Sequence, residues 1–208
     1  MKNYLVEFIG TFFLFLVISL STRVVDSPLL APVAIGFGLA VMVYAGGRIS
    51  GAHYNPAVSL AAAVRGVLPF AQVLPYWIAQ IAGAVAAAFV AFILVGSDEV
   101  TVIQAEPGKI FLAEFLFTAV LAYVVMNVAT AKKAEGNSYY GVAIGATVMV
   151  AALCVGPVSG GAFNPAVAVA ACVSGFFAWS QLWIYVVACL AGGVLGALLF
   201  KAASPDGE

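Results

Sequence analysis

The chain has 208 residues, of which 64% are hydrophobic and only 8% are charged, and its mean hydropathy is +1.13. A soluble domain carries charge on about a quarter of its residues, so this composition predicts an integral membrane protein. The net charge is −1, from eight basic and nine acidic side chains, which leaves no basic surface for nucleic acid.

Six apolar segments are long enough to cross a lipid bilayer, which takes about 20 helical residues each. Polar or Pro- and Gly-rich stretches separate them. Two further apolar runs, Pro56–Val64 and Pro165–Val173, have about nine residues each and reach only halfway across. The predicted spans are, in chain order, Tyr4–Ser21, Pro32–Gly47, Val73–Val95, Ile110–Thr130, Tyr139–Pro157 and Gln181–Lys201. We therefore predict an all-α membrane protein with six transmembrane helices and two re-entrant half-helices, in a single domain over residues 1–208.

The second half of the sequence repeats the first. The central phrases begin at Ser50 and Ser159, 109 residues apart. The matching segments are SGAHYNPAV (50–58) with SGGAFNPAV (159–167), EFIGT (7–11) with EFLFT (114–118), and 76–83 with 185–192. We predict two repeat halves, approximately 1–100 and 107–201. With three spans in each half, the second half enters the membrane from the opposite side, so the repeat is inverted.

Lysine and arginine are distributed unevenly between the two sides of the predicted membrane. With the amino terminus inside, the cytoplasmic side receives Lys2, Arg48, Arg65, Lys132, Lys133 and Lys201, and the outer side receives Arg23 and Lys109. Because basic residues concentrate in cytoplasmic loops, this distribution predicts that both termini are cytoplasmic.

An Asn-Pro-Ala motif stands at the start of each short apolar run. Asparagine is a strong N-cap and proline suits the first helical position, so Asn55-Pro56 and Asn164-Pro165 predict two helix starts. A single motif of this kind is an ordinary helix start. Two half-helices that meet near the membrane midplane would instead aim both amides and both positive dipole ends at one spot. Such a spot donates hydrogen bonds to a neutral molecule and repels cations, including hydronium.

Two other classes of protein share some of these features. A coupled transporter also has inverted repeats and broken helices, and Glu7, Glu114 and His53 are its candidate proton carriers. Saturable uptake driven by a pH gradient would identify it. An enzyme would need a nucleophile with a base, and the single histidine leaves no such pair beside the motifs. The spacing of the three cysteines predicts no metal site, and no cofactor is expected.

The paired Asn-Pro-Ala motifs in an inverted repeat resemble the aquaporin and aquaglyceroporin (major intrinsic protein) family over nearly the whole chain. The resemblance implies one passive pore per subunit, a homotetramer in the lipid bilayer, and a bacterial inner membrane as its location. It implies that Asn55 and Asn164 are the pore asparagines. Glu7 and Glu114 would be structural acceptors beside the re-entrant loops, and His53 would line the pore or organise its loop.

The resemblance also places the selectivity filter of the family on this chain. Counting from the motifs gives Ile35, Ala152, Gly161 and Val167, with Phe37 as the alternative to Ile35 if the alignment slips by two residues. The family usually carries arginine at the last of these positions, and many water channels carry histidine at the second. Valine at position 167 resembles the filter of some bacterial members that pass metalloids.

An apolar filter with two small residues predicts a wide constriction without strong donors. We expect a channel for water and for larger neutral solutes such as glycerol, urea, ammonia, hydrogen peroxide or metalloid hydroxides. The alternatives are a strict water channel with an atypical filter and, less favoured, a proton-coupled secondary transporter. An apolar constriction can also lose its water and close.

Overall fold

The computed structural model describes residues 1–24, 27–96 and 105–204. Parts of the polar or Pro- and Gly-rich stretches predicted between the spans, residues 25–26 and 97–104, lie outside these ranges. Six helices are long and apolar enough to span a membrane: α1 (Lys2–Val24), α2 (Leu30–Ser50), α4 (Phe70–Val95), α5 (Pro107–Thr130), α6 (Tyr140–Ser159) and α8 (Leu182–Ala203). Two helices between them are short, α3 (Pro56–Arg65) and α7 (Pro165–Val173). The predicted all-α class with six spans and two half-helices is therefore confirmed.

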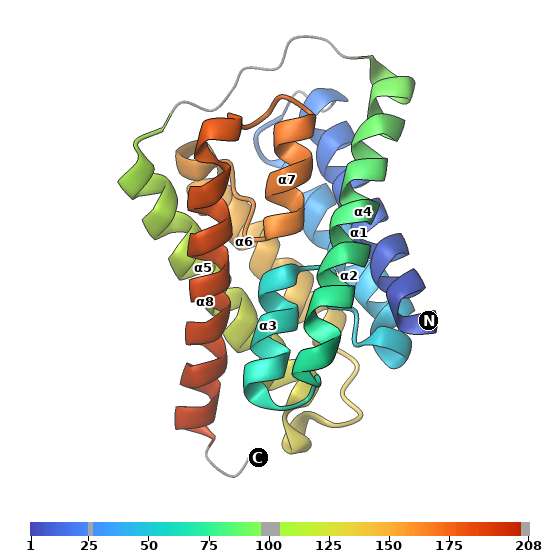
Figure 1. Cartoon of the computed structure of the whole chain (residues 1–208), viewed down its shortest axis with the longest axis vertical. Coiled ribbons are helices and arrows are strands. Elements are labelled where there is room, and N and C mark those ends of the chain that lie inside the picture. Colours follow the sequence, from blue (N-terminus) through green and yellow to red (C-terminus); the bar gives the residue numbers. More distant parts are fainter. Residues whose placement is uncertain (25–26, 97–104, 205–208) are drawn as a thin grey trace.

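The two short helices point toward one another from opposite ends of the molecule (Figure 1). Helix α3 lies in the lower half of this view and α7 in the upper half, and their first turns meet at mid-height. The amino terminus and the last turns of α8 both lie in the lower half. The short helices thus run in opposite directions, as the inverted repeat requires.

Glycines let the long helices cross with their backbones in contact. A Cβ atom added at Gly83 of α4 would overlap the carbonyl oxygen of Phe8 in α1. A Cβ at Gly192 of α8 would likewise overlap the carbonyl oxygen of Phe115 in α5. Small residues permit such close approach between membrane helices. Because the two glycines correspond in the repeat, the molecule builds the same crossing twice.

Alanine at Gly83 is expected to destabilise the protein by about 1–3 kcal/mol, because the methyl group has to push two backbones apart. Gly108→Ala is the matched control, since no atom lies within 4 Å of a Cβ built there. Thermal unfolding in detergent, followed by size-exclusion chromatography, measures the difference. Equal unfolding temperatures for the two variants would contradict the tight crossing.

The repeat halves are interlocked. Helix α3 packs on α8 of the other half, and α7 packs on α4. A Cβ at Gly193 of α8 would lie 2.6 Å from the carbonyl oxygen of Ala57 in α3, so this contact is also close. Helices α2 and α6 form a further contact between the halves. Each short helix is therefore held largely by the half to which it does not belong.

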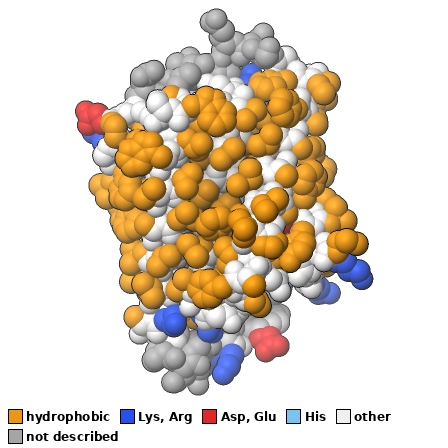
Figure 2. All heavy atoms as spheres, viewed as in Figure 1, with side chains coloured by type: hydrophobic (Ala, Val, Ile, Leu, Met, Phe, Trp, Pro, Cys, Tyr) orange, Lys and Arg blue, Asp and Glu red, His pale blue; other side chains and the backbone are white. Residues whose placement is uncertain are grey.

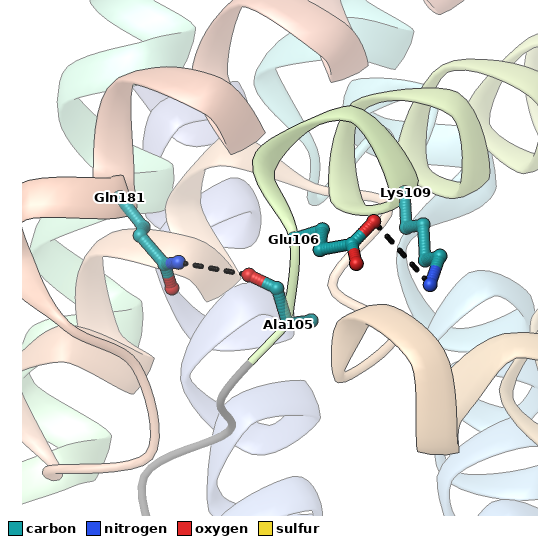
Figure 3. A network of polar contacts seen from close by, with 4 residues as sticks. All are labelled: Ala105, Glu106, Lys109 and Gln181. Carbon is teal, nitrogen blue, oxygen red and sulfur yellow. Dashed lines mark hydrogen bonds and ion pairs between the residues drawn. The ribbon is translucent and has the colours of Figure 1, made fainter.

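The surface matches a bilayer environment. Apolar side chains cover the middle of the face shown in Figure 2, and lysine and arginine side chains gather toward its ends. At the upper end, the Gln181 side chain donates to the carbonyl oxygen of Ala105 at 3.2 Å, which ties the segment before α8 to the segment before α5 (Figure 3). Lys109 and Glu106 form an exposed ion pair at 3.3 Å beside it (Figure 3). The chain is an integral membrane protein with six spans.

Candidate functional site

A cavity of about 120 Å³ lies where the two short helices meet. Its lining includes every residue that the sequence predicted for the channel: Ile35, His53, Asn55, Ala152, Gly161, Asn164 and Val167. Phe37, the alternative to Ile35, does not line this cavity and is 58% exposed on the outside of α2. Two residues along a helix turn a side chain by about 200°, so only one of the pair can face inward.

Each asparagine caps the short helix that follows it. Asn55 Oδ1 accepts a hydrogen bond from the backbone N–H of Ala57 at 2.8 Å. Asn164 Oδ1 accepts from Ala166 at 2.9 Å. Pro56 and Pro165 follow the caps, where a missing N–H costs nothing. The positive ends of both helix dipoles therefore face the cavity.

The same two side chains join the repeat halves. Asn55 Nδ2 donates to the carbonyl oxygen of Phe163 at 2.8 Å, and Asn164 Nδ2 donates to that of Tyr54 at 2.8 Å. A carboxamide nitrogen carries two protons, so each asparagine keeps one N–H for a molecule in the cavity. The two amides thus form a pair of donors at the junction of the halves.

Glu7 of α1 organises the first re-entrant loop from a fully buried position. Its carboxylate accepts hydrogen bonds from Ser50 Oγ at 2.6 Å, the backbone N–H groups of His53 at 3.0 Å and Tyr54 at 2.6 Å, and Gln80 Nε2 at 2.8 Å. Four donors fill the four acceptor positions of an ionised carboxylate. This glutamate is therefore a saturated acceptor inside the fold.

Glu114 of α5 does the same for the second loop, with one difference. It accepts from Ser159 Oγ at 2.7 Å and from the backbone N–H groups of Ala162 at 3.0 Å and Phe163 at 2.6 Å. Its fourth contact is the thiol of Cys189 at 3.5 Å. A thiol is a weak donor, so the second carboxylate is held less firmly than the first.

The loops contain backbone in a conformation that is rare for residues other than glycine. Ala52, Tyr54 and Phe163 have φ angles of 50°, 49° and 47°, in the left-handed region that residues other than glycine rarely adopt. Tyr54 and Phe163 each donate their N–H to a buried glutamate and turn their C=O to the opposite asparagine. The buried carboxylates therefore hold a strained loop in the shape that brings the halves together.

The walls of the cavity are apolar stripes from four long helices, of which the sequence predicted only Ile35 and Ala152. They are Leu14 and Ile18 with Thr22 on α1, Ile35 and Leu39 on α2, Leu121 and Val125 on α5, and Ile144 and Val148 with Ala152 on α6. Each stripe follows the i, i+4 spacing of one helix face. Stepping by four residues from Ile35 and Ala152 would have found two of them.

The cavity suits an uncharged molecule. In the ranges that the structure describes, none of its lining side chains is Lys, Arg, Asp or Glu. Its polar side-chain groups come mainly from His53, Asn55 and Asn164, against walls of Val, Leu, Ile, Ala and Phe. The same ranges hold no group of three or more His, Cys, Asp or Glu side chains placed to bind a metal ion. An ion would lose its hydration here without gaining a counter-charge.

Comparison with known proteins agrees with this geometry. Residues 1–200 match the family described as major intrinsic protein. The chain is 37% identical over 218 residues to Aquaporin NIP1-4 of Oryza sativa subsp. japonica, covering 100% of this chain and 79% of the rice protein. It is 35% identical over 229 residues to Aquaporin Z of Rhodopseudomonas palustris (strain ATCC BAA-98 / CGA009), covering 99% of this chain and 94% of the bacterial protein.

A solved structure shares the fold. The X-ray structure of the aquaglyceroporin from Plasmodium falciparum superposes with a TM-score of 0.82 at 18% identity, covering 99% of this chain and 98% of that one. The family resemblance predicted from the paired motifs is confirmed. This chain therefore belongs to the major intrinsic protein family, and it is a membrane channel rather than an enzyme.

Proposed function

We propose that this protein is a passive channel for water and for larger uncharged solutes such as glycerol, urea or metalloid hydroxides. One observation carries the proposal: Val167, Ala152 and Gly161 line the cavity together and bring neither a charge nor a side-chain donor to it. Pore diameter, lining hydrogen-bond groups and electrostatic barriers decide what a pore passes. Small apolar residues at a constriction make it wider and less selective for water.

The arrangement of polar groups suits solutes that carry hydroxyl or amide groups on a small frame. The amide groups of Asn55 and Asn164 lie at the junction of the halves, while the helix stripes form apolar walls. A polyol or a metalloid hydroxide can hydrogen-bond to the amides and keep its remaining surface against apolar side chains. Such a solute replaces part of its hydration shell without meeting a charge.

Stopped-flow light scattering on proteoliposomes tests the proposal by comparing water, glycerol, urea and arsenous acid. We expect the protein to pass all four above the rate of empty vesicles. Ala152→Phe serves as the comparison variant. A phenyl ring at this cavity position fills the space that the larger solutes need, so the variant should pass them more slowly than the parent protein does. Passage of water alone would indicate a strict water channel with an atypical filter. Saturable uptake that follows a pH gradient would indicate a coupled transporter.

We infer that the chain is one channel domain of a bacterial-type family member, placed in an inner membrane with both termini in the cytoplasm. The excess of basic residues on the side of the termini supports the orientation. The bacterial relative whose length the alignment covers to 94% supports the location. We infer a homotetramer from the family. Native mass spectrometry of the detergent-extracted protein tests the assembly, and a subunit count other than four overturns it.

A further inference from the structure

The two short helices begin alike but end differently. Arg65 lies in the last turn of α3, whereas the position 109 residues further along is Ser174, directly after α7. In both copies the chain then turns away at a glycine with a positive φ angle, 94° at Gly66 and 79° at Gly175. A cation at the carboxyl end of a helix binds its last carbonyl oxygens and compensates the negative end of its dipole. Helix α7 lacks such a residue of its own.

An arginine from α1 takes this place. Arg23, in the last turn of α1, donates from Nη2 to the carbonyl oxygen of Ser174 at 2.9 Å. Its guanidinium carbon lies 5.0 Å from the ring centre of Phe176 and 5.4 Å from that of Phe92 in α4. A guanidinium group within about 6 Å of an aromatic ring centre is attracted by the ring face. Arg23 therefore ties the turn after α7 to α1 and α4.

The first half has a contact of the same kind. The guanidinium carbon of Arg65 lies 4.8 Å from the ring centre of Phe200 in α8. Each short helix is thus fastened at its carboxyl end by an arginine on an aromatic ring. In the first half the arginine belongs to the short helix, and in the second half α1 supplies it.

The two turns differ in their relation to the cavity. Phe176 and Phe177 line the cavity, whereas their counterparts Val67 and Leu68 do not. The side chain of Phe176 is 7% exposed, so it is packed on nearly all sides. Arg23 contacts this ring without belonging to the lining. Since α7 ends at the upper end of the molecule (Figure 1), Arg23 lies behind the wall of the upper part of the cavity.

We propose that Arg23 is a positioning residue that fixes Phe176 and the turn after α7 against the cavity, and so limits the width of its upper part. The inference rests on the proposed function as a channel for neutral solutes. Without the guanidinium group, space opens behind the ring of Phe176, and the ring can withdraw from the cavity. A wider passage favours larger solutes over water, because pore diameter is one of the properties that decide what a pore passes.

Arg23→Ala tests the proposal in proteoliposomes. Stopped-flow light scattering should show a ratio of glycerol to water permeability about two- to fivefold higher than in the parent protein, the change expected from losing one contact between a cation and an aromatic ring. Arg65→Ala is the matched control, because it removes the same kind of contact at the other short helix, where Phe200 does not line the cavity. It should leave the ratio unchanged. Size-exclusion chromatography verifies that both variants are folded.

A double-mutant cycle tests whether Arg23 acts through the ring. Phe176→Ala removes the wall residue and should itself raise the ratio of glycerol to water permeability. Adding Arg23→Ala to this variant should bring no further increase, because the ring on which Arg23 acts is gone. Residues in contact show such non-additive effects, whereas independent residues do not. An equal increase in both backgrounds would contradict the proposal.

The motion of the ring can be measured without any solute. With 4-fluorophenylalanine at position 176, the relaxation of the ¹⁹F NMR signal reports how freely the ring moves. We expect faster ring motion in Arg23→Ala than in the parent protein and no change in Arg65→Ala. A loss of stability alone would not separate the two arginine variants in this way.

Three outcomes overturn the inference: an unchanged or lower permeability ratio in Arg23→Ala, an equal increase in Arg65→Ala, or unchanged motion of the ring at position 176. A parent protein that passes no glycerol overturns the proposed function instead. The ¹⁹F signal still decides in that case whether Arg23 holds the ring, so the two failures are distinguishable.

Discussion

Arginine in place of Val167 is expected to reduce the permeability for glycerol and arsenous acid by about tenfold or more, while water permeability keeps most of its value. Val167 lies in the first turn of α7 and lines the cavity together with Ala152 and Gly161. A guanidinium group there occupies the width that the larger solutes need. It also adds donors that a single water can satisfy, and each 1.4 kcal/mol of added barrier slows passage about tenfold. Stopped-flow light scattering measures both rates on the same vesicles.

Val167→Leu separates size from charge in this experiment. Leucine adds bulk at the same position without a charge or a donor. It should therefore slow glycerol less than arginine does, and it should leave the permeability for cations unchanged. Equal glycerol rates for the parent and Val167→Arg would show that position 167 does not form the constriction. Loss of water together with glycerol would show that the larger side chain blocks the pore completely.

Replacing Glu7 by glutamine is expected to destabilise the protein by several kcal/mol, and more than Glu114→Gln does. A glutamine keeps one acceptor oxygen and turns an NH2 group toward two of the four donors around Glu7. Each buried donor without an acceptor costs about 1–3 kcal/mol. Around Glu114, one of the four contacts is the thiol of Cys189, which can accept from an NH2 group and loses little.

Thermal unfolding in detergent compares the two glutamine variants, with Glu106→Gln as control. Glu106 is an exposed partner of Lys109, and an exposed ion pair contributes little. We expect the unfolding temperature to decrease in the order Glu106→Gln, Glu114→Gln, Glu7→Gln. A larger loss for Glu114→Gln would contradict the tighter hydrogen bonding assigned to the first loop.

The sequence predicted those parts of the molecule that local chemistry determines. Proline after asparagine marks a helix start without reference to the rest of the chain, so α3 and α7 begin at Pro56 and Pro165 as expected. The long helices were located but drawn too short. The first was predicted over Tyr4–Ser21 and extends over Lys2–Val24, because hydropathy marks the apolar part of a span while the helix continues into polar surroundings.

Contacts between distant segments could not be predicted in this way. The bond from Gln80 to Glu7 joins residues 73 positions apart, and its link to Ser59 depends on the path of the re-entrant loop. The repeat was a guide to Glu114, because that residue has a twin. It was no guide to Gln80 and Ser59, because the second half has cysteine and alanine at their places. A repeat predicts the features that its halves share and gives no information on a feature that only one half has.

The interlocked halves have a consequence for biogenesis. The first three helices leave the ribosome before the carbonyl oxygen of Phe163 exists, yet this oxygen is the acceptor of the Asn55 amide. Helix α3 also lacks α8, against which it packs in the finished protein. During synthesis, the first re-entrant segment therefore has no stable place in the bilayer. The asparagine pair can close only after the second re-entrant loop has been made, so the junction of the halves forms late in synthesis.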